Sequence, residues 1–355
     1  MGYYQNYGSH IQIVHLHQVY QNQNCFMNIA NLNTKEIIEG IYSNNIAIVS
    51  KAITIIESTK PEHRIIANQI IEGCISKKHD TIRIGITGVP GAGKSTFIEH
   101  FGSMLTGFEK KVAVLTIDPS SSRTKGSILG DKTRMQELVK DPNAYIRPSA
   151  SGSSLGGVTR KTRESIVILE AAGFDIILIE TIGVGQSETA VHDMVDFFLL
   201  LKLAGAGDEL QGIKRGIIEM ADSIVINKSD GNNVQNAARA KMEFARALHM
   251  FPPKENGWSP EVLTCSALEN RGLEEIWKLI ANYCQTMKET GYFNKNRQQQ
   301  NEKWLIQYLE QELLSKFYQN PKTKKLLPLL KKEVINGNTS PFSAAEKLLN
   351  VLSTN

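Results

Sequence analysis

A glycine-rich loop between an apolar run and a helical pattern constrains the fold of this chain more than any other feature. The run IRIGIT at residues 82–87 is followed at once by GVPGAGKS at 88–95, a full match to the pattern G-x-x-x-x-G-K-[ST]. Glycines let several backbone N–H groups converge on phosphate oxygens, and a helix that starts beside them adds the positive end of its dipole. The order strand, loop, helix therefore predicts a site for nucleotide phosphates.

Two side chains of this loop have predicted roles of their own. Lys94 is expected to reach the β- and γ-phosphates, and the Ser95 hydroxyl is a predicted ligand of Mg²⁺. The alternative, a chance glycine loop, is disfavoured because strand, loop and helix all fall where phosphate binding needs them. The predicted phosphate-binding residues are Gly88, Val89, Pro90, Gly91, Ala92, Gly93, Lys94, Ser95 and Thr96.

Short apolar runs alternate with helix-length segments over the middle of the chain. The runs are nearly continuous in apolar residues, which is typical of strands that helices cover on both faces. We therefore expect an α/β fold, with a mostly parallel sheet flanked by helices and its site at the carboxyl ends of the strands. The predicted strands are 82–87, 112–117, 175–180, 197–201, 223–227 and 262–265, and the predicted helices are 94–106, 133–140, 159–172, 233–249 and a segment after 272.

The two ends of the chain differ from this middle part. Residues 1–30 hold no charged residue and no clean periodicity, so we expect a poorly ordered leader, and whether residues 1–26 belong to the natural protein stays open. Helices are expected over 46–56 and 61–75, with an earlier one capped at Asn33. The predicted parts are a leader at 1–30, a helical segment at 31–80, a nucleotide-binding domain at 81–291 and a helical arm at 292–355.

An apolar stripe runs along the predicted C-terminal arm. Trp304, Leu305, Tyr308, Leu309, Leu313 and Phe317 recur at helical spacing. Either the stripe packs on the nucleotide-binding domain of its own chain, or it closes a two-fold homodimer. The lysines that follow between 322 and 332 are interpreted as a solvated face rather than as a membrane or nucleic-acid patch.

The identity of the base is predicted by Asn-Lys-Ser-Asp at residues 227–230, directly after an apolar strand. The carboxylate of Asp230 can accept hydrogen bonds from N1–H and the exocyclic amine of guanine, whereas adenine would leave that carboxylate unpaired. A backbone N–H in the later segment Ser266-Ala267 can meet the guanine O6. The expected guanine-binding residues are thus Asn227, Lys228, Asp230, Ser266 and Ala267, and the expected nucleotide is GTP or GDP.

Three acids at or near strand ends are candidates for the magnesium site with Ser95. Asp118 follows a strand, Asp131 lies in a turn, and Glu180 ends the strand at 175–180. Mg²⁺ takes few protein oxygens and completes its octahedron with water and phosphate, so these acids would act directly or through water. Each acid taken singly could instead cap a helix or face solvent. Segments 120–134 and 183–188 are the loops expected to change order on hydrolysis.

Composition excludes several classes of protein. Forty Lys and Arg stand against 36 Asp and Glu, a net charge of +4 that does not point to nucleic acid. No apolar run approaches the length that spans a bilayer. The four cysteines, Cys25, Cys74, Cys265 and Cys284, have no metal or redox spacing. We therefore expect a soluble, cytoplasmic protein without a membrane or nucleic-acid partner.

Taken together, these motifs resemble the GTPases associated with methylmalonyl-CoA mutase, the MeaB/ArgK type, which carries the older label of lysine/arginine/ornithine (LAO/AO) transport ATPase. The resemblance covers about residues 85–270. Its one local departure is Thr124-Lys125-Gly126, where the family often has Thr-Gly-Gly. The segments that carry it are GVPGAGKST at 88–96, IDPSSSRTKGSILGDKTRM at 117–135, SLGGVTRKTRE at 154–164, GFDIILIETIGVGQSE at 173–188, GAGDELQGIKRGIIEMAD at 205–222 and NKSD at 227–230.

The resemblance implies a homodimeric P-loop GTPase that guards the loading and protection of the cobalamin cofactor of an adenosylcobalamin-dependent acyl-CoA mutase. It implies that Asp118, Asp131 and Glu180 surround the magnesium ion. The segment 205–215 would be a third switch that faces the mutase, with Asp208 and Lys214 tied to signalling and hydrolysis.

Hydrolysis by a phosphate-loop GTPase depends mainly on positioning and charge stabilisation, and a group supplied in trans can add about 10³–10⁵ in rate. Slow intrinsic turnover that the mutase stimulates is therefore expected. Gln186 is a candidate to act near the γ-phosphate, with a surface glutamine as the alternative. The predicted catalytic residues are Lys94, Glu180, Gln186, Asp208 and Lys214.

Two rival functions remain. One is a nucleotide-dependent kinase or ATPase that energises lysine, arginine or ornithine transport, which the older label suggests but no membrane segment supports. The other is a metallochaperone GTPase, which the scattered cysteines disfavour. Which acyl-CoA mutase is served stays open, as do the activator of hydrolysis and the geometry of the dimer.

Overall fold

The computed structural model of this chain describes residues 33–77, 79–117, 135–148, 155–181, 187–204 and 215–353. The predicted leader lies outside these residues. By its internal contacts the chain divides into two compact units, Met1–Met287 and Lys288–Asn355.

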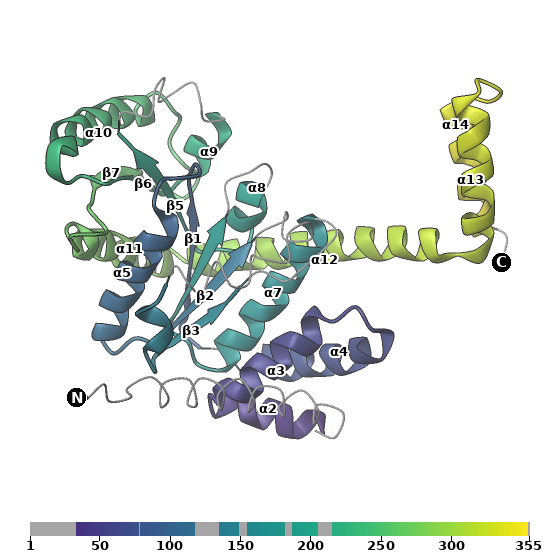
Figure 1. Cartoon of the computed structure of the whole chain (residues 1–355), viewed down its shortest axis with the longest axis horizontal. Coiled ribbons are helices and arrows are strands. Elements are labelled where there is room, and N and C mark those ends of the chain that lie inside the picture. The colour runs from purple at the N-terminus through teal and green to yellow at the C-terminus, as the bar shows by residue number, and fades with distance from the viewer. Residues whose placement is uncertain are drawn as a thin grey trace, which may run out of the picture. The chain divides into compact units, whose positions relative to one another are not determined.

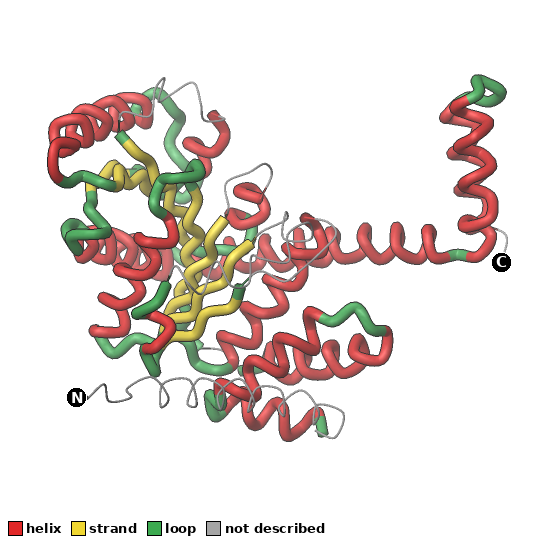
Figure 2. The backbone as a smooth tube through the Cα atoms, viewed as in Figure 1, coloured by secondary structure: helices red, strands yellow, loops and turns green. Residues whose placement is uncertain are grey.

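A seven-stranded sheet forms the centre of the first unit (Figures 1 and 2). Every pair of neighbouring strands is parallel, so all carboxyl ends lie at the same edge. The strand that precedes the glycine loop, β1, is central, between β4 and β5. In spatial order the strands are β3 (Ala144–Arg147), β2 (Val112–Ile117), β4 (Ile176–Thr181), β1 (Ile82–Thr87), β5 (Phe197–Leu203), β6 (Ser223–Asn227) and β7 (Glu261–Thr264).

Helices flank this sheet, which confirms the predicted α/β fold. All residues of β2 and β4 are buried, as strands covered on both faces must be. Alternate residues of these strands join a large apolar cluster with α7, and α5 contacts the same two strands. A second cluster joins β5, β6 and β7 to α9 and α10. The flanking helices are α5 (Lys94–Gly107), α7 (Leu155–Ala171), α8 (Ser187–His192), α9 (Arg215–Met220), α10 (Val234–Leu248) and α11 (Leu273–Glu289).

The N-terminal helices share the main apolar cluster of the sheet. They are α2 (Thr34–Tyr42), α3 (Ile46–Glu57) and α4 (Pro61–Ile75). The predicted cap is confirmed, because the Asn33 side chain accepts a backbone N–H of the first turn and Glu36 accepts the N–H of Asn33. Helices α3 and α4 pack on α7, and an ion pair between Arg147 and Glu57 fastens α3 to the end of β3.

The predicted helix at 133–140 is wrong over the residues that the structure describes. Only a 3₁₀ turn, Leu138–Lys140, forms there. Pro142 disfavours a helical conformation at the preceding Asp141, which is extended, so any helix must end by Lys140. Strand β3 follows directly and was not predicted, because four residues give too short a pattern to separate a strand from a loop.

The described elements of the second unit are all helices. It contains the 28-residue helix α12 (Tyr292–Gln319), then α13 (Pro321–Ile335) and α14 (Pro341–Ser353). A small apolar cluster of Leu330, Ala344 and Leu348 joins α13 to α14. The predicted apolar stripe lies on α12, where Leu305, Leu309 and Leu313 are all more than half exposed. No helix within the described residues is long and apolar enough to cross a membrane.

Candidate nucleotide site

The phosphate loop leaves β1 at the carboxyl edge of the sheet and enters α5 at Lys94. Two of its glycines are required by geometry. A Cβ on Gly88 would lie 2.3 Å from the carbonyl oxygen of Leu201 in β5, and one on Gly93 would lie 2.7 Å from Nδ2 of Asn227. Gly93 also has a φ of 83°, which side chains other than glycine rarely adopt. The loop backbone therefore lies in close contact with β5 at Leu201 and with the end of β6 at Asn227.

The Lys94 ammonium lies inside the loop. Its Nζ donates to the carbonyl oxygens of Gly88, at 2.8 Å, and Val89, at 3.2 Å. Burial lowers the pKa of this ammonium, while the nearby carboxylates of Glu180 and Glu188 raise it. The cation is thus held where the phosphates of a nucleotide would approach the loop.

Ser95 and Glu180 lie together beside this lysine. The Ser95 hydroxyl donates to Oε1 of Glu180 at 3.1 Å, and Glu180 is buried at the end of β4. A buried hydrogen bond of 2.8 Å between the hydroxyls of Thr181 and Thr87 joins the ends of β4 and β1. A hydroxyl and a carboxylate are the hard oxygen ligands that Mg²⁺ prefers, so this pair fits the predicted metal site.

Four of the predicted guanine-binding residues are joined by hydrogen bonds to one another and to the phosphate loop. Asn227 ends β6, and its Nδ2 donates to the carbonyl oxygen of Ala92 in the phosphate loop at 2.9 Å. The Oδ1 of Asn227 accepts the backbone N–H of Ala267 at 3.3 Å. The Ser266 hydroxyl donates to Oδ2 of Asp230 at 2.5 Å. One asparagine therefore ties the phosphate loop to the segment expected to meet the base.

Lys228, the residue after this asparagine, has a left-handed backbone with a φ of 58°. The turn that it starts is fixed from the next strand, because the Ser229 N–H donates to the carbonyl oxygen of Cys265 at 2.9 Å. The Cys265 thiol also donates to Oδ1 of Asn227 at 3.3 Å. Burial, and secondarily Asp230, raises the pKa of Cys265 to about 12.

Several predicted site residues lie outside the described part of the chain. The described residues supply the whole predicted phosphate loop, all five guanine-binding residues, and two of the four magnesium ligands. The residues that fall outside are Asp118, Asp131, Gln186, Asp208 and Lys214, together with segments 120–134, 183–186 and 205–214 of the predicted switches.

Two buried polar residues at the end of the predicted switch segment 183–188 were given no role of their own. Ser187 and Glu188 begin α8 and are 0% and 6% exposed. The available signal was an acid that directly follows the glycine-containing segment 183–186 after Glu180. That signal is weak, because an acid in the first turn of a helix usually serves the helix alone.

Comparisons with known proteins identify relatives of this chain. Residues 49–322 match the family described as methylmalonyl Co-A mutase-associated GTPase MeaB. A probable GTPase of Mycobacterium tuberculosis is 48% identical over 305 residues, which are 86% of this chain and 91% of that protein. The GTPase ArgK of Escherichia coli is 43% identical over 319 residues, 90% of this chain and 96% of its own.

Two further comparisons extend this picture. A mouse protein named methylmalonic aciduria type A homolog, mitochondrial, is 44% identical over 320 residues, 87% of this chain and 77% of that protein. A crystal structure titled LAO/AO transport system kinase superposes with a TM-score of 0.72 at 37% identity and covers 91% of this chain and 99% of its own. Because the family match spans most of the chain and these relatives align along nearly its full length, this chain belongs to the methylmalonyl-CoA mutase-associated GTPase family, MeaB.

Proposed function

We propose that this protein binds and hydrolyses GTP as a chaperone that gates cobalamin loading and protection of an adenosylcobalamin-dependent acyl-CoA mutase. The name of the family and that of the mouse relative support the link to methylmalonyl-CoA metabolism. The observation that carries the GTP assignment is Asn227, whose amide joins the phosphate loop at Ala92 to the base segment at Ala267.

The selection of guanine follows from hydrogen-bond chemistry. The Asp230 carboxylate is held by Ser266 and can accept the N1–H and the exocyclic amine of guanine. Adenine offers no matching pair of donors at these positions, so its binding would leave this carboxylate desolvated and unpaired. GTP is therefore the proposed nucleotide and GDP the proposed product.

The phosphates are bound and oriented at the other end of the same site. Lys94 would exchange its two carbonyl partners for phosphate oxygens, and Ser95 and Glu180 would hold Mg²⁺ together with Asp118 and Asp131. When bound, that ion neutralises charge on the phosphate oxygens. Gln186, Asp208 and Lys214 complete the proposed catalytic set.

Turnover is proposed to be slow until the mutase binds. Phosphoryl transfer needs positioned donors and charge stabilisation rather than covalent chemistry from the protein, so a partner that positions one further group accelerates it strongly. Segment 205–215, which contains Asp208 and Lys214, is the proposed mutase-facing switch.

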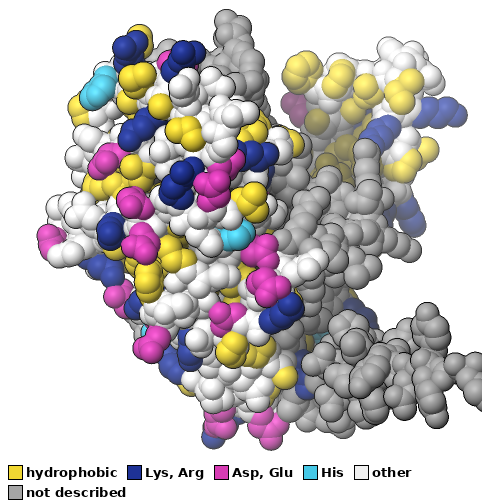
Figure 3. Space-filling view, turned by 60° about the vertical axis from the view of Figure 1, so that its left-hand side comes forward, with side chains coloured by type: hydrophobic (Ala, Val, Ile, Leu, Met, Phe, Trp, Pro, Cys, Tyr) yellow, Lys and Arg dark blue, Asp and Glu magenta, His cyan; other side chains and the backbone are white. Residues whose placement is uncertain are grey.

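Protein partners are proposed for the helical arm. The exposed leucines of α12 would pair two chains into a homodimer, since a stripe of large apolar side chains favours burial against a partner. On the face drawn in Figure 3, Lys and Arg side chains are interspersed with Asp and Glu rather than gathered into a basic stripe. This supports partners other than nucleic acid.

A cytoplasmic location is proposed as well. The described cysteines, Cys74, Cys265 and Cys284, are buried free thiols. Such thiols are typical of proteins that fold in a reducing compartment.

The test is a pair of measurements on the full-length protein. Fluorescent GTP and ATP analogues are titrated first, and we expect a preference for GTP of about 100-fold or more. Phosphate release is then measured with and without a purified cognate mutase, and an increase with the mutase is expected. Equal GTPase rates in both samples would contradict the partner role while leaving the GTPase assignment intact.

The rival function, a kinase or ATPase that energises lysine, arginine or ornithine transport, is kept because one similar solved structure is titled LAO/AO transport system kinase. It predicts that ATP competes with GTP and that the nucleotide's γ-phosphate appears on a protein rather than as free phosphate. The same titration, with radiolabelled nucleotide and a gel, separates the two functions.

A further inference from the structure

Contacts of one arginine converge on the residue that is expected to recognise guanine. The Nη2 of Arg271 donates to the carbonyl oxygen of Ser229 at 2.5 Å, and the Arg271 backbone exchanges two hydrogen bonds of 3.0 Å with that of Ser266. Ser229 directly precedes Asp230, and the Ser266 hydroxyl donates to the Asp230 carboxylate. Arg271 therefore reaches Asp230 both through the chain before it and through its carboxylate.

The side chain of Arg271 fixes the backbone from which Asp230 projects. A peptide group is planar, so the bond to the Ser229 carbonyl orients the peptide group that ends at the Cα of Asp230. The N–H of Ser229 donates to the carbonyl oxygen of Cys265 at 2.9 Å. Both polar backbone groups of Ser229 are thus held by the later segment of the chain, and Arg271 supplies the bond nearer to Asp230.

The backbone of Arg271 fixes the hydroxyl that holds the carboxylate. Its pairing with Ser266 closes the loop 266–271 on itself. The side chain of Asn270 is joined to His100 by a hydrogen bond of 2.8 Å, so this loop is also anchored to α5, the helix that begins in the phosphate loop. The Ser266 hydroxyl therefore has a fixed position from which to orient its acceptor.

Recognition of guanine depends on the orientation of this carboxylate. Guanine presents its N1–H and its exocyclic amine side by side, so both carboxylate oxygens must lie near the plane of the base to accept them. Hypoxanthine keeps the N1–H but lacks the amine. A carboxylate that turns out of this plane loses one of the two bonds, and the advantage of guanine over hypoxanthine falls with it.

We propose that Arg271 is a positioning residue that sets the selectivity of this site for guanine by holding Asp230 in the orientation that accepts both donors. This inference rests on the proposed function and deepens it at the same site. The Arg271 side chain is 57% exposed, and its guanidinium also pairs with Glu269 at 3.0 Å. A moderate effect is therefore expected, and the experiment must separate the hydrogen bond to Ser229 from the ion pair.

The test compares Arg271→Met with Arg239→Met in the full-length protein. Competition against a fluorescent GDP analogue gives the affinities for GDP and for inosine diphosphate, whose base is hypoxanthine. Arg271→Met keeps an extended side chain but removes the donor. GDP affinity should fall about 3- to 10-fold, and the ratio of GDP to inosine diphosphate affinity should fall about threefold or more. Arg239 is an exposed arginine of α10, and its variant should leave both affinities unchanged.

Two further variants separate the hydrogen bond from the ion pair. Glu269→Gln removes the charge that pairs with Arg271 but leaves the donor to Ser229, so the affinity ratio should stay that of the wild type. Arg271→Lys keeps a cation that can donate to one carbonyl but lacks the planar fork of a guanidinium. Its ratio is expected to lie between those of the wild type and Arg271→Met.

Thermal unfolding without nucleotide checks that each variant is folded. The proposal is overturned by an unchanged ratio in folded Arg271→Met, by an equal loss of affinity for both nucleotides, or by the same change of ratio in Glu269→Gln.

Failure of the proposed function would look different. In that case the wild type itself would bind no guanine nucleotide or would bind ADP as tightly as GDP, and the proposal for Arg271 would fail with it. If the wild type prefers GDP to ADP and Arg271→Met leaves the ratio unchanged, only the proposal for Arg271 fails.

Discussion

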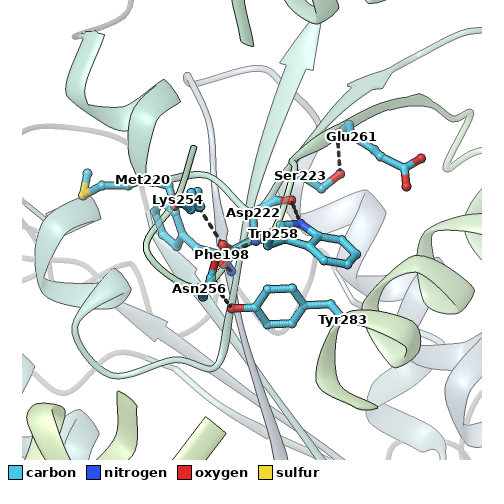
Figure 4. Close-up of polar contacts among 9 residues, drawn as sticks. All are labelled: Phe198, Met220, Asp222, Ser223, Lys254, Asn256, Trp258, Glu261 and Tyr283. Atoms are coloured by element: carbon cyan, nitrogen blue, oxygen red, sulfur yellow. Dashed lines mark hydrogen bonds and ion pairs between the residues drawn. The ribbon is translucent and has the colours of Figure 1, made fainter. Parts of the chain in front are cut away.

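The two edges of the same sheet are built in opposite ways. At the amino edge, the Asp222 carboxylate accepts the Phe198 N–H at 2.9 Å and the Lys254 ammonium at 2.6 Å (Figure 4). Its backbone carbonyl accepts the indole N–H of Trp258, and the ring of Trp258 contacts Tyr283 edge-on. Every polar atom of Asp222 that is drawn there has a partner within the protein.

At the carboxyl edge, polar groups keep unused bonding capacity. Lys94 donates only to loop carbonyls, and Ser187 and Glu188 are buried without hydrogen bonds in the described residues. One edge of the sheet is therefore complete in the protein alone, while we propose that a nucleotide completes the other. Substitutions at the amino edge should therefore change stability, and those at the carboxyl edge should change binding.

The largest effect is expected from Lys94→Ala. The variant removes the cation that is expected to contact the phosphates, so GTP turnover should fall by about 100-fold or more. The free energy of unfolding should hardly change or should rise, because a buried ammonium with a lowered pKa is removed. Phosphate release and urea unfolding measure the two quantities. A large loss of stability would contradict the expectation that substitutions at the carboxyl edge change binding rather than stability.

The opposite pattern, a loss of stability with little change in GTP affinity, is expected from Asp222→Ala. It leaves the Phe198 N–H without its acceptor and the Lys254 ammonium with the Met220 carbonyl but no carboxylate, which costs about 3 kcal/mol of stability. GTP affinity should stay within about twofold, because the change lies at the opposite edge. The control is Lys140→Ala, which breaks an exposed ion pair with Glu137 and should cost less than about 0.5 kcal/mol.

A pH series sharpens the comparison, because Cys265 lies at the carboxyl edge but is as buried as a core residue. Burial raises the pKa of Cys74 to about 11 and that of Cys265 to about 12. Unfolded thiols titrate near pH 8.5, at about 1.4 kcal/mol per pH unit for each group. The stabilisation is therefore complete below about pH 8.5 and is lost as the pH rises from there toward 11 to 12.

Urea unfolding at pH 8, 9 and 10 tests this expectation in the wild type and in Cys265→Ala. The variant should lose stability less steeply with pH, since one titrating thiol is gone. Identical slopes would mean that Cys265 ionises in the folded protein, and its pKa would then not be raised.

The smallest effect is expected from Ser266→Ala. Asp230 loses the hydrogen bond that orients it, so GTP affinity should fall about 3- to 10-fold while stability changes little. The matched variant at the amino edge is Ser223→Ala, which removes a hydrogen bond of 2.9 Å from the Ser223 hydroxyl to the Glu261 carbonyl. That variant should cost about 1 kcal/mol of stability and leave affinity unchanged. GTP titrations and urea unfolding curves, measured on both variants, distinguish the loss of affinity from the loss of stability.

The elements that could be predicted from the sequence are those with a continuous local pattern. The strand before the glycine loop and the long helices are continuous in their periodicity, and they form as expected. Strand β3 and the turn at Leu138–Lys140 depend on tertiary pairing and on one proline, and both were misjudged.

In the site, the residue types were predictable but their contacts were not. The bond from Asn227 to Ala92 joins positions 135 residues apart, which no local pattern specifies. Glu188 fell within the predicted switch segment 183–188 but was given no role of its own, because burial of an acid is a property of the fold rather than of the sequence around it.

The shared core of the N-terminal helices has a consequence for synthesis of the chain. Helices α2 to α4 are made first, but they pack on α7, which is made roughly 80 residues after α4 ends. At about 5–20 residues per second this delay lasts roughly 4 to 16 seconds. During that interval the apolar side chains of Ile37, Ile53 and Ile70 lack their final cover. We expect the nascent chain to be a target for ribosome-associated chaperones until α7 begins to emerge.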